Sequence, residues 1–234
     1  MVALLYDEKE RFMMKRIVVL VLLALVATPQ FVRAEDVKPI QLAVFNPIQL
    51  VPEGDSIKGG RLSVFYTVNK DVSGLSLVWL GVNRATGDVN GVEIGLGNWV
   101  EGSAYGGQLG IVNHAGKRFV GLQYGMVNVT EGDLSGLQWG LVNWTEGFMH
   151  GIQAGVVNVS KGQSVGLDLG VVNYSQDSFK GLQAGFVNYA GQMHGVQLGI
   201  VNYTKSLDGL QIGLGNYNGN KKPMEFMVLV NWSF

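Results

Sequence analysis

Residues that could carry out catalysis are few and scattered in this chain. The histidines His114, His150 and His194 lie in or beside turn-rich segments and share no spacing that would place them around one metal ion. The chain has no cysteine, which excludes thiol nucleophiles, thiolate metal sites and disulfides. No serine occupies a nucleophile elbow, and no two acidic residues are spaced for acid–base work. We therefore expect no enzyme, no metal site and no small-molecule cofactor.

Phosphate chemistry is also poorly supported. Gly95-Leu96-Gly97 and Gly213-Leu214-Gly215 are glycine-rich, but no helix pattern follows them to bind an anion at its N-terminus. The formal net charge is −1, so there is no basic surplus to neutralise a nucleic-acid backbone. We expect no nucleic-acid partner.

One asparagine returns at a nearly constant interval through most of the chain. Between residues 69 and 231 it recurs with eight spacings of fifteen residues and three of fourteen, which indicates a repeat architecture. We expect this asparagine to cap a strand end by bonding to the turn backbone; the alternative is a polar ring at a pore mouth or a contact with a glycan. The asparagines assigned to the repeat are Asn83, Asn98, Asn113, Asn128, Asn143, Asn158, Asn173, Asn188, Asn202 and Asn216.

The repeated unit reads Gly-Leu-Gln-x-Gly-x-Val-Asn and occurs whole at 121–128, 136–143 and 181–188. We number its first glycine as position one. Positions two, four and six are apolar in nearly every copy, so side-chain character alternates with a period of two, which predicts a strand and not a helix. Counting from position fourteen to position nine gives a strand of eleven residues followed by a turn of four.

The two faces of the predicted strand differ in character. Tyr124 and Trp139 at position four are too large for a narrow interior whose other layers would hold Ala154 and Ala184, so we expect the even positions to face outward into lipid. The polar residue at position three would then face an enclosed, wet lumen. These predicted lumen-facing residues are Glu93, Gln108, Gln123, Gln138, Gln153, Asp168, Gln183, Gln197 and Gln211.

Two architectures can repeat at fifteen residues. The unit is symmetric about position four, so an antiparallel meander would place valine opposite glycine and glutamine opposite glycine. We therefore predict an all-β meander that closes into a barrel of about 12 strands. The alternative is a parallel β-solenoid with fifteen-residue coils, which the uniformly short turns keep open.

The end of the chain alternates in the same way. Phe226, Val228, Val230, Trp232 and Phe234 occupy every second place, and Phe234 is the last residue. In this the chain resembles bacterial outer-membrane β-barrel proteins, whose closing strand ends in phenylalanine as an assembly signal. The repeated units resemble those of bacterial surface-repeat proteins over roughly residues 60 to 234. These resemblances imply outer-membrane lipid and the barrel assembly machinery as partners, and they supply no catalytic residue.

The first 34 residues have the pattern of an export signal. Lys15 and Arg16 precede an apolar run at 17–27, and small residues at 32 and 34 mark a processing site, so Met14 is a better start than Met1. We predict a signal peptide at 1–34, a lead-in segment at 35–59 and a β-repeat domain at 60–234. The expected function is that of an exported, non-enzymatic envelope protein in the outer membrane or at the cell surface, acting as a structural component or narrow pore. The alternative is a surface or periplasmic solenoid that binds a protein or polysaccharide.

Overall fold

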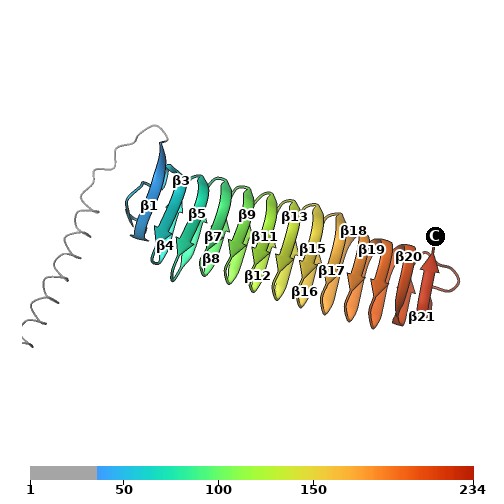
Figure 1. Ribbon diagram of the computed structural model, residues 1–234. Coiled ribbons are helices and arrows are strands. Elements are labelled where there is room, and N and C mark those ends of the chain that lie inside the picture. Colours follow the sequence, from blue (N-terminus) through green and yellow to red (C-terminus); the bar gives the residue numbers. More distant parts are fainter. Residues whose placement is uncertain (1–35) are drawn as a thin grey trace, which may run out of the picture.

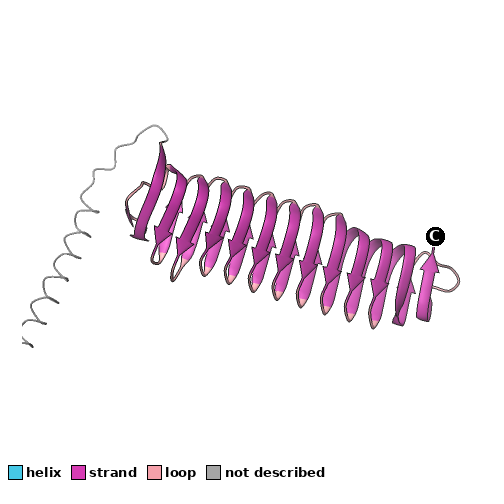
Figure 2. Ribbon diagram, viewed as in Figure 1, coloured by secondary structure: helices cyan, strands magenta, loops and turns pink. Residues whose placement is uncertain are grey.

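The structure, a computed structural model, describes residues 36–234, which form one continuous sheet wound into a parallel β-solenoid (Figure 1). No helix occurs among these residues (Figure 2). The strands are β1 (Val37–Phe45), β2 (Ile48–Gln49), β3 (Ser56–Ser63), β4 (Tyr66–Asn69), β5 (Val72–Val78), β6 (Val82–Ala85), β7 (Val89–Ile94), β8 (Gly97–Val100), β9 (Ala104–Leu109), β10 (Val112–Ala115), β11 (Phe119–Tyr124), β12 (Val127–Thr130), β13 (Leu134–Trp139), β14 (Val142–Thr145), β15 (Met149–Ala154), β16 (Val157–Ser160), β17 (Ser164–Leu169), β18 (Val172–Ala184), β19 (Val187–Leu198), β20 (Val201–Asn218) and β21 (Phe226–Ser233).

From β3 to β17, each repeat forms one coil made of a long strand and a short strand, whereas β18, β19 and β20 each continue through the turn into the next coil. In the coil that begins with β11, the chain bends at Gly125 and Met126, returns as β12, and turns again at 131–133 before β13 starts the next coil. The parallel register places each residue beside the residue at the same unit position in the next coil, with Gly121 beside Gly136 and Asn128 beside Asn143. The predicted eleven-residue strand is therefore divided in two by a bend after position four.

The prediction of an antiparallel barrel is wrong, because successive coils pair in parallel. In the described part of the chain, antiparallel pairing is confined to the ends, between β1 and β2 and between β20 and β21. The barrel and outer-membrane interpretations therefore lose their structural basis, and the solenoid alternative fits. The bend explains why: a two-stranded coil buries positions three and eight between its two layers, and the bulky side chains at positions two, four and six remain outside.

Glycine is required where coils approach most closely. Gly136, at position one, has a φ of 144°, and a Cβ there would lie 2.0 Å from the carbonyl oxygen of Gly121. At position five, a Cβ on Gly140 would lie 2.2 Å from the oxygen of Gly125 and 2.7 Å from Nδ2 of Asn128. These glycines let the coils stack and leave room for the asparagine side chain.

The interior combines a narrow apolar row with amide side chains. Position fourteen is apolar and buried in most coils, as in Phe119, Leu134 and Met149, and it packs beside the turn at 131–133 and its equivalents. The remaining interior contains glycine, the small side chain of position ten, such as Ala115 or Thr130, the glutamine of position three and the asparagine of position eight. Most of the cross-section is therefore polar, and its stability depends on the hydrogen bonds described below.

The predicted domain boundaries relate to the structure as follows. The signal peptide expected at 1–34 lies outside the described residues. Within the expected lead-in segment, residues from Val37 onward already form β1, β2 and the beginning of β3, and β1 pairs in parallel with β3. The solenoid thus includes most of this segment.

Candidate functional site

The repeat asparagines form a continuous internal row. Within Asn83–Asn216, the Nδ2 atom of each asparagine donates to Oδ1 of the next at 2.8–2.9 Å. From Asn98 to Asn202, the same Nδ2 also donates to the carbonyl oxygen of position four in the following coil, as Asn128 does to Trp139 at 3.0 Å. All ten side chains are buried, so the row is inaccessible to a glycan or a solute.

The position-three residues form a second row of opposite polarity. Here Nε2 of each glutamine donates back to the preceding coil, as Gln123 does to Gln108 at 2.8 Å and Gln138 to Gln123 at 2.7 Å. Hydroxyl groups from position ten add donors, for example from Thr130 to Oε1 of Gln123 at 3.2 Å. The predicted lumen-facing residues from Glu93 to Gln211 all lie in this buried row, in a packed interior and not in a wet lumen.

The N-terminal end of this row contains a buried ion pair that the sequence did not suggest. Arg61 occupies position three and reaches past the small Ser76 to Oε1 of Glu93, at 3.0 Å, with both side chains fully buried. Burial lowers the pKa of Arg61 to about 10, an effect that Glu93 opposes. Burial raises the pKa of Glu93, and Arg61 and Gln108 oppose that rise. Arg61 lies two residues after the repeat glycine Gly59, and this spacing could have identified it.

Asp168 is a second ionisable group in the row. It is fully buried, and Ser175 and Gln183 donate to its Oδ2 at 3.4 Å each, while Oδ1 has no hydrogen-bond partner. Burial raises the pKa of this carboxyl to about 7, and the two hydrogen bonds oppose the rise only in part. The carboxyl is enclosed by its neighbours in the row and has no exposed surface.

The histidines do not come together. His114 stacks on Trp99 with ring centroids 3.9 Å apart and lies 3.2 Å from Glu131, whereas His194 lies 3.3 Å from Asp208. No group of three potential metal ligands occurs in residues 36–234. The exposed surface is therefore the remaining candidate for function.

That surface has one apolar edge. We define the apolar edge as the outward side chains at positions two, four, six and seven of the coils from residue 60 to residue 215, around the bend of each coil. No charged residue occupies any of these positions. At position six the exposed fractions run from 41% for Val171 to 64% for Leu214, with Ile111, Met126 and Leu141 near one half.

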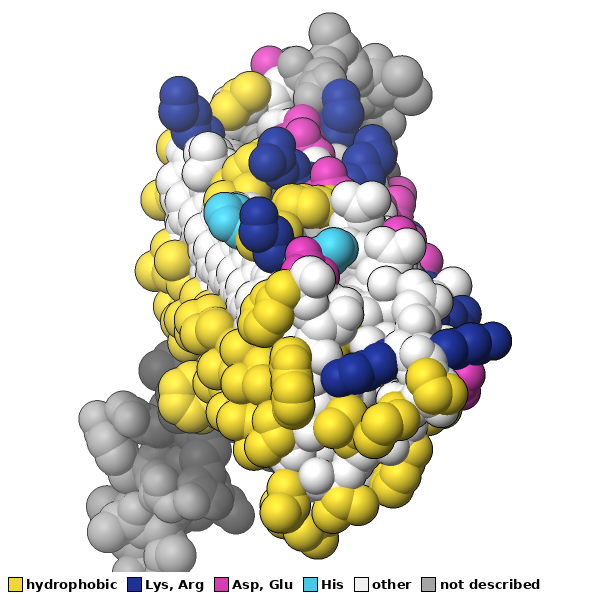
Figure 3. All heavy atoms as spheres, turned by 90° about the vertical axis from the view of Figure 1, so that its right-hand side faces the viewer, with side chains coloured by type: hydrophobic (Ala, Val, Ile, Leu, Met, Phe, Trp, Pro, Cys, Tyr) yellow, Lys and Arg dark blue, Asp and Glu magenta, His cyan; other side chains and the backbone are white. Residues whose placement is uncertain are grey.

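The opposite edge is polar. The turns at positions eleven to thirteen carry most of the exposed charges, including Lys117, Glu131, Asp133, Glu146 and Lys161. Viewed along the solenoid, apolar side chains gather at the lower edge, and most charged side chains lie above them (Figure 3). A contiguous exposed apolar surface of this extent indicates a contact surface.

Aromatic rings lie on both layers, within the apolar edge and next to it. Tyr124 and Trp139 lie on the long-strand layer, 53% and 57% exposed. On the short-strand layer, the rings of Tyr174, Tyr189, Tyr203 and Tyr217 at position nine stack with centroids 4.7–5.2 Å apart. These tyrosine rings cover one another's faces, so they present their edges to solvent.

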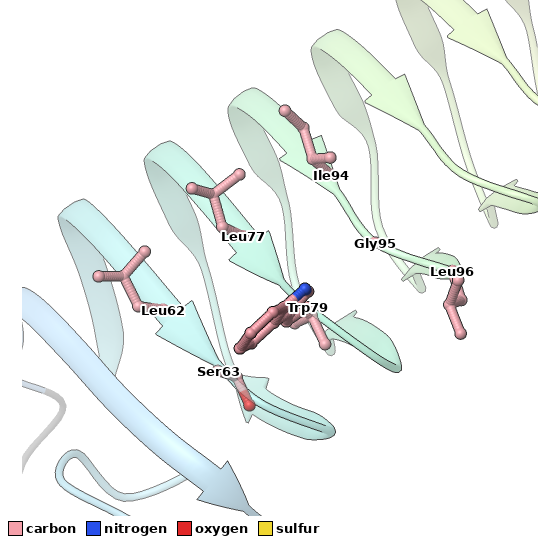
Figure 4. A pocket seen from close by; sticks show the side chains of 8 residues that line it. Leu62, Ser63, Leu77, Trp79, Ile94, Gly95 and Leu96 are labelled. Atoms are coloured by element: carbon pink, nitrogen blue, oxygen red, sulfur yellow. The ribbon is translucent and has the colours of Figure 1, made fainter.

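A shallow pocket interrupts the apolar edge near its N-terminal end. The coil between Gly74 and Gly91 is two residues longer than the fifteen-residue unit, and its extra length includes Trp79, which is 80% exposed. Leu62, Leu77 and Ile94 line up on successive strands above Trp79 (Figure 4). The pocket has a volume of about 490 Å³, and its lining is mostly apolar.

The predicted closing strand caps the solenoid. β21 pairs antiparallel with β20, and Phe226, Val228, Val230, Trp232 and Phe234 are exposed. Asn231 ends the glutamine row by donating to Oε1 of Gln211 at 3.1 Å. Nζ of Lys221 donates to Oδ1 of Asn231 and, at 2.7 Å, to the carbonyl oxygen of Trp232, which shields part of the sheet's edge from another strand.

Comparisons with protein-family models, curated proteins and solved structures gave no match for this chain. No helix in residues 36–234 is long and apolar enough to cross a membrane. The fold places the protein among parallel β-solenoids, and the apolar edge is its candidate functional surface.

Proposed function

We propose that this protein is an exported, non-enzymatic β-solenoid that acts as a binding module and engages its partner along the apolar edge. The observation that carries the proposal is the charge-free exposed surface that runs across the coils from residue 60 to residue 215. Exposed apolar surface is costly in water, and a large contiguous patch on a folded protein marks an interaction site.

The interior supports a binding role and not a catalytic one. The polar residues that repeat most regularly are committed to the two buried amide rows, where they bond to each other. These rows make the coil stack a rigid support for the side chains outside it.

A polysaccharide is the less favoured partner. Sugar rings pack on open aromatic faces, but the tyrosine row stacks face to face with interplanar angles of 7–13°. The apolar edge offers few polar side chains that could bond to hydroxyl groups. An apolar partner matches this surface better.

The proposal is tested by co-sedimentation of the purified protein with bacterial cell-envelope fragments, which contain lipid, protein and polysaccharide together. The edge variant Ile111→Asp/Leu141→Asp places two charges at position six, where the parent side chains are 47% and 48% exposed. The control Phe148→Asp/Gln163→Asp places the same charges on the polar edge, at exposed positions. We expect the edge variant to lose binding about tenfold and the control to retain it. Equal binding by both variants would refute a role for the apolar edge.

A further inference from the structure

We infer that the partner of the apolar edge is the surface of a lipid bilayer, into which the edge inserts as a ridge. This inference rests on the binding function proposed above and identifies its partner. Three properties of the edge support it: its lack of charge, its shape and the placement of its aromatic rings.

The charge distribution matches a bilayer interface. The edge from residue 60 to residue 215 has no charged side chain, and the charged turns lie on the opposite side of each coil. A protein placed at a lipid interface has this arrangement, with apolar side chains in the acyl boundary and charged groups in water. Because no lysine or arginine flanks the ridge in a row, binding should depend on apolar burial and not on anionic headgroups.

The shape of the edge favours a fluid partner over a second copy of the chain. Each coil bends sharply over two residues, such as Gly140 and Leu141, and the bends line up along one edge of the solenoid (Figure 1). The exposed position-six side chains at these bends form the crest, and the two layers slope away from it. Two such crests would meet along a line, far below the roughly 800 Å² per partner of a stable protein interface. A bilayer can close around both slopes.

The length of the crest is sufficient for stable insertion. It runs over nine coils from Leu96 to Leu214, and at about 4.8 Å per coil it is roughly 40 Å long. Interfacial insertion to about 5–10 Å would bury positions four, six and seven along this length.

The aromatic side chains lie where a bilayer interface would be. Trp139 and Tyr124 on one slope, at position four, and Trp144 and the tyrosine row on the other, at position nine, lie two residues further from the crest than the apolar residues of positions six and seven. Tryptophan and tyrosine are enriched at this depth because their rings are both apolar and hydrogen-bonding. Trp79, the most exposed tryptophan, projects beside the pocket at the N-terminal end of the crest.

The test uses the purified full chain and vesicles of pure phosphatidylcholine, with and without brominated acyl chains. All five tryptophans lie within the solenoid, at 79, 99, 139, 144 and 232, so their fluorescence reports on this part of the chain alone. Wild type and variants share residues 1–35, so any contribution of the apolar run at 17–27 to vesicle binding cancels between them.

We expect wild-type emission to shift to shorter wavelength and to be quenched by brominated lipid, equally at low and high salt. Ile111→Asp/Leu141→Asp should lower the partition coefficient about tenfold, and Phe148→Asp/Gln163→Asp should leave it unchanged. Circular dichroism and thermal melts verify that both variants remain folded; if the edge variant unfolds, Leu141→Asn at the same position replaces it.

Absence of tryptophan quenching, or quenching that the edge variant retains, would overturn the lipid inference. If the protein does not bind these vesicles but still binds envelope fragments through the apolar edge, the partner is a protein or polysaccharide. The lipid inference is then wrong, and the proposed binding function still holds. Sedimentation velocity without lipid identifies the other occupant: a dimer that the edge variant abolishes, together with no vesicle binding, would mean that the edge binds a second copy.

Discussion

Asp168 lies in register with Gln153, and no side-chain hydrogen bond joins these two residues, although every other neighbouring pair from Glu93 to Asn231 in the position-three row is bonded. A glutamine at 168 would donate to Oε1 of Gln153. A carboxylate has no proton to donate, so the row is interrupted at this rung.

Stability should therefore fall as pH rises through the pKa of Asp168. Burial raises that pKa from 3.8 to about 7, so the folded state prefers the protonated acid, and its advantage is complete below pH 4 and lost above about pH 7. The full effect is about 4 kcal/mol. We expect wild type to be more stable to denaturant at pH 5 than at pH 8.5, and Asp168→Asn to remove most of this difference by raising stability at pH 8.5. Glu146→Gln, at an exposed acid, is the control; an Asp168→Asn variant with the wild-type pH dependence would contradict the assignment.

Removing only one partner of the Arg61–Glu93 ion pair, near the N-terminal end of the position-three row, should strongly destabilise the protein. Arg61→Met leaves the Glu93 carboxylate buried without its cation, and we expect a loss of about 3–5 kcal/mol in the free energy of unfolding. Arg61→Met/Glu93→Gln replaces the pair by a neutral side chain and one more glutamine in the row, so it should recover most of that loss. Urea unfolding of the three proteins measures both values. A double variant no more stable than Arg61→Met would show that the arginine acts through packing and not through its charge.

The asparagine row ends one coil short of its possible length. Thr67 lies in register with Asn83, and neither Oγ1 of Thr67 nor Oδ1 of Asn83 has a hydrogen-bond partner. Thr67→Asn should supply the missing donor and stabilise the protein by about 1 kcal/mol. Thr67→Val, which has a similar shape and no donor, is the matched control in thermal unfolding. Equal stability of the two variants would exclude a gain from the added hydrogen bond.

The sequence predicted the length of the repeat and which side chains share a strand face better than it predicted whether successive strands run parallel or antiparallel. Alternation placed Gln138 and Trp139 on opposite faces, and in the structure the first is buried and the second is 57% exposed. It also assigned Asn83 to Asn216 to the repeat. Asn69 and Asn231, which share the spacing, lie elsewhere: Asn69 is beside Ala85, at position ten, and Asn231 ends the glutamine row.

The barrel prediction rests on the symmetry of the unit and on an assumption about side-chain volume. The size of Trp139 favours a barrel only if a coil must hold that ring inside, and a coil can keep such residues outside when smaller groups fill its interior. The bend at Gly140 and Leu141 makes the interior thin, and Gly136, Gln138 and Asn143 fill it. A buried asparagine repeated in parallel register can bond to its own copies, and this was the signal in the sequence that favoured the solenoid.

Deletion of one coil tests the parallel register directly. Removing residues 144–158 joins Asn143 to Val159, so every later residue keeps its position and Asn143 comes to lie beside Asn173. We expect a folded protein with an unchanged circular dichroism signal per residue and a length shorter by about 4.8 Å in small-angle X-ray scattering. Removing residues 144–151 instead should unfold the protein or cause aggregation, because it shifts every later residue out of register with both amide rows. In an antiparallel meander the fifteen-residue deletion would reverse all following strands, so equal damage from the two deletions would refute the parallel stack.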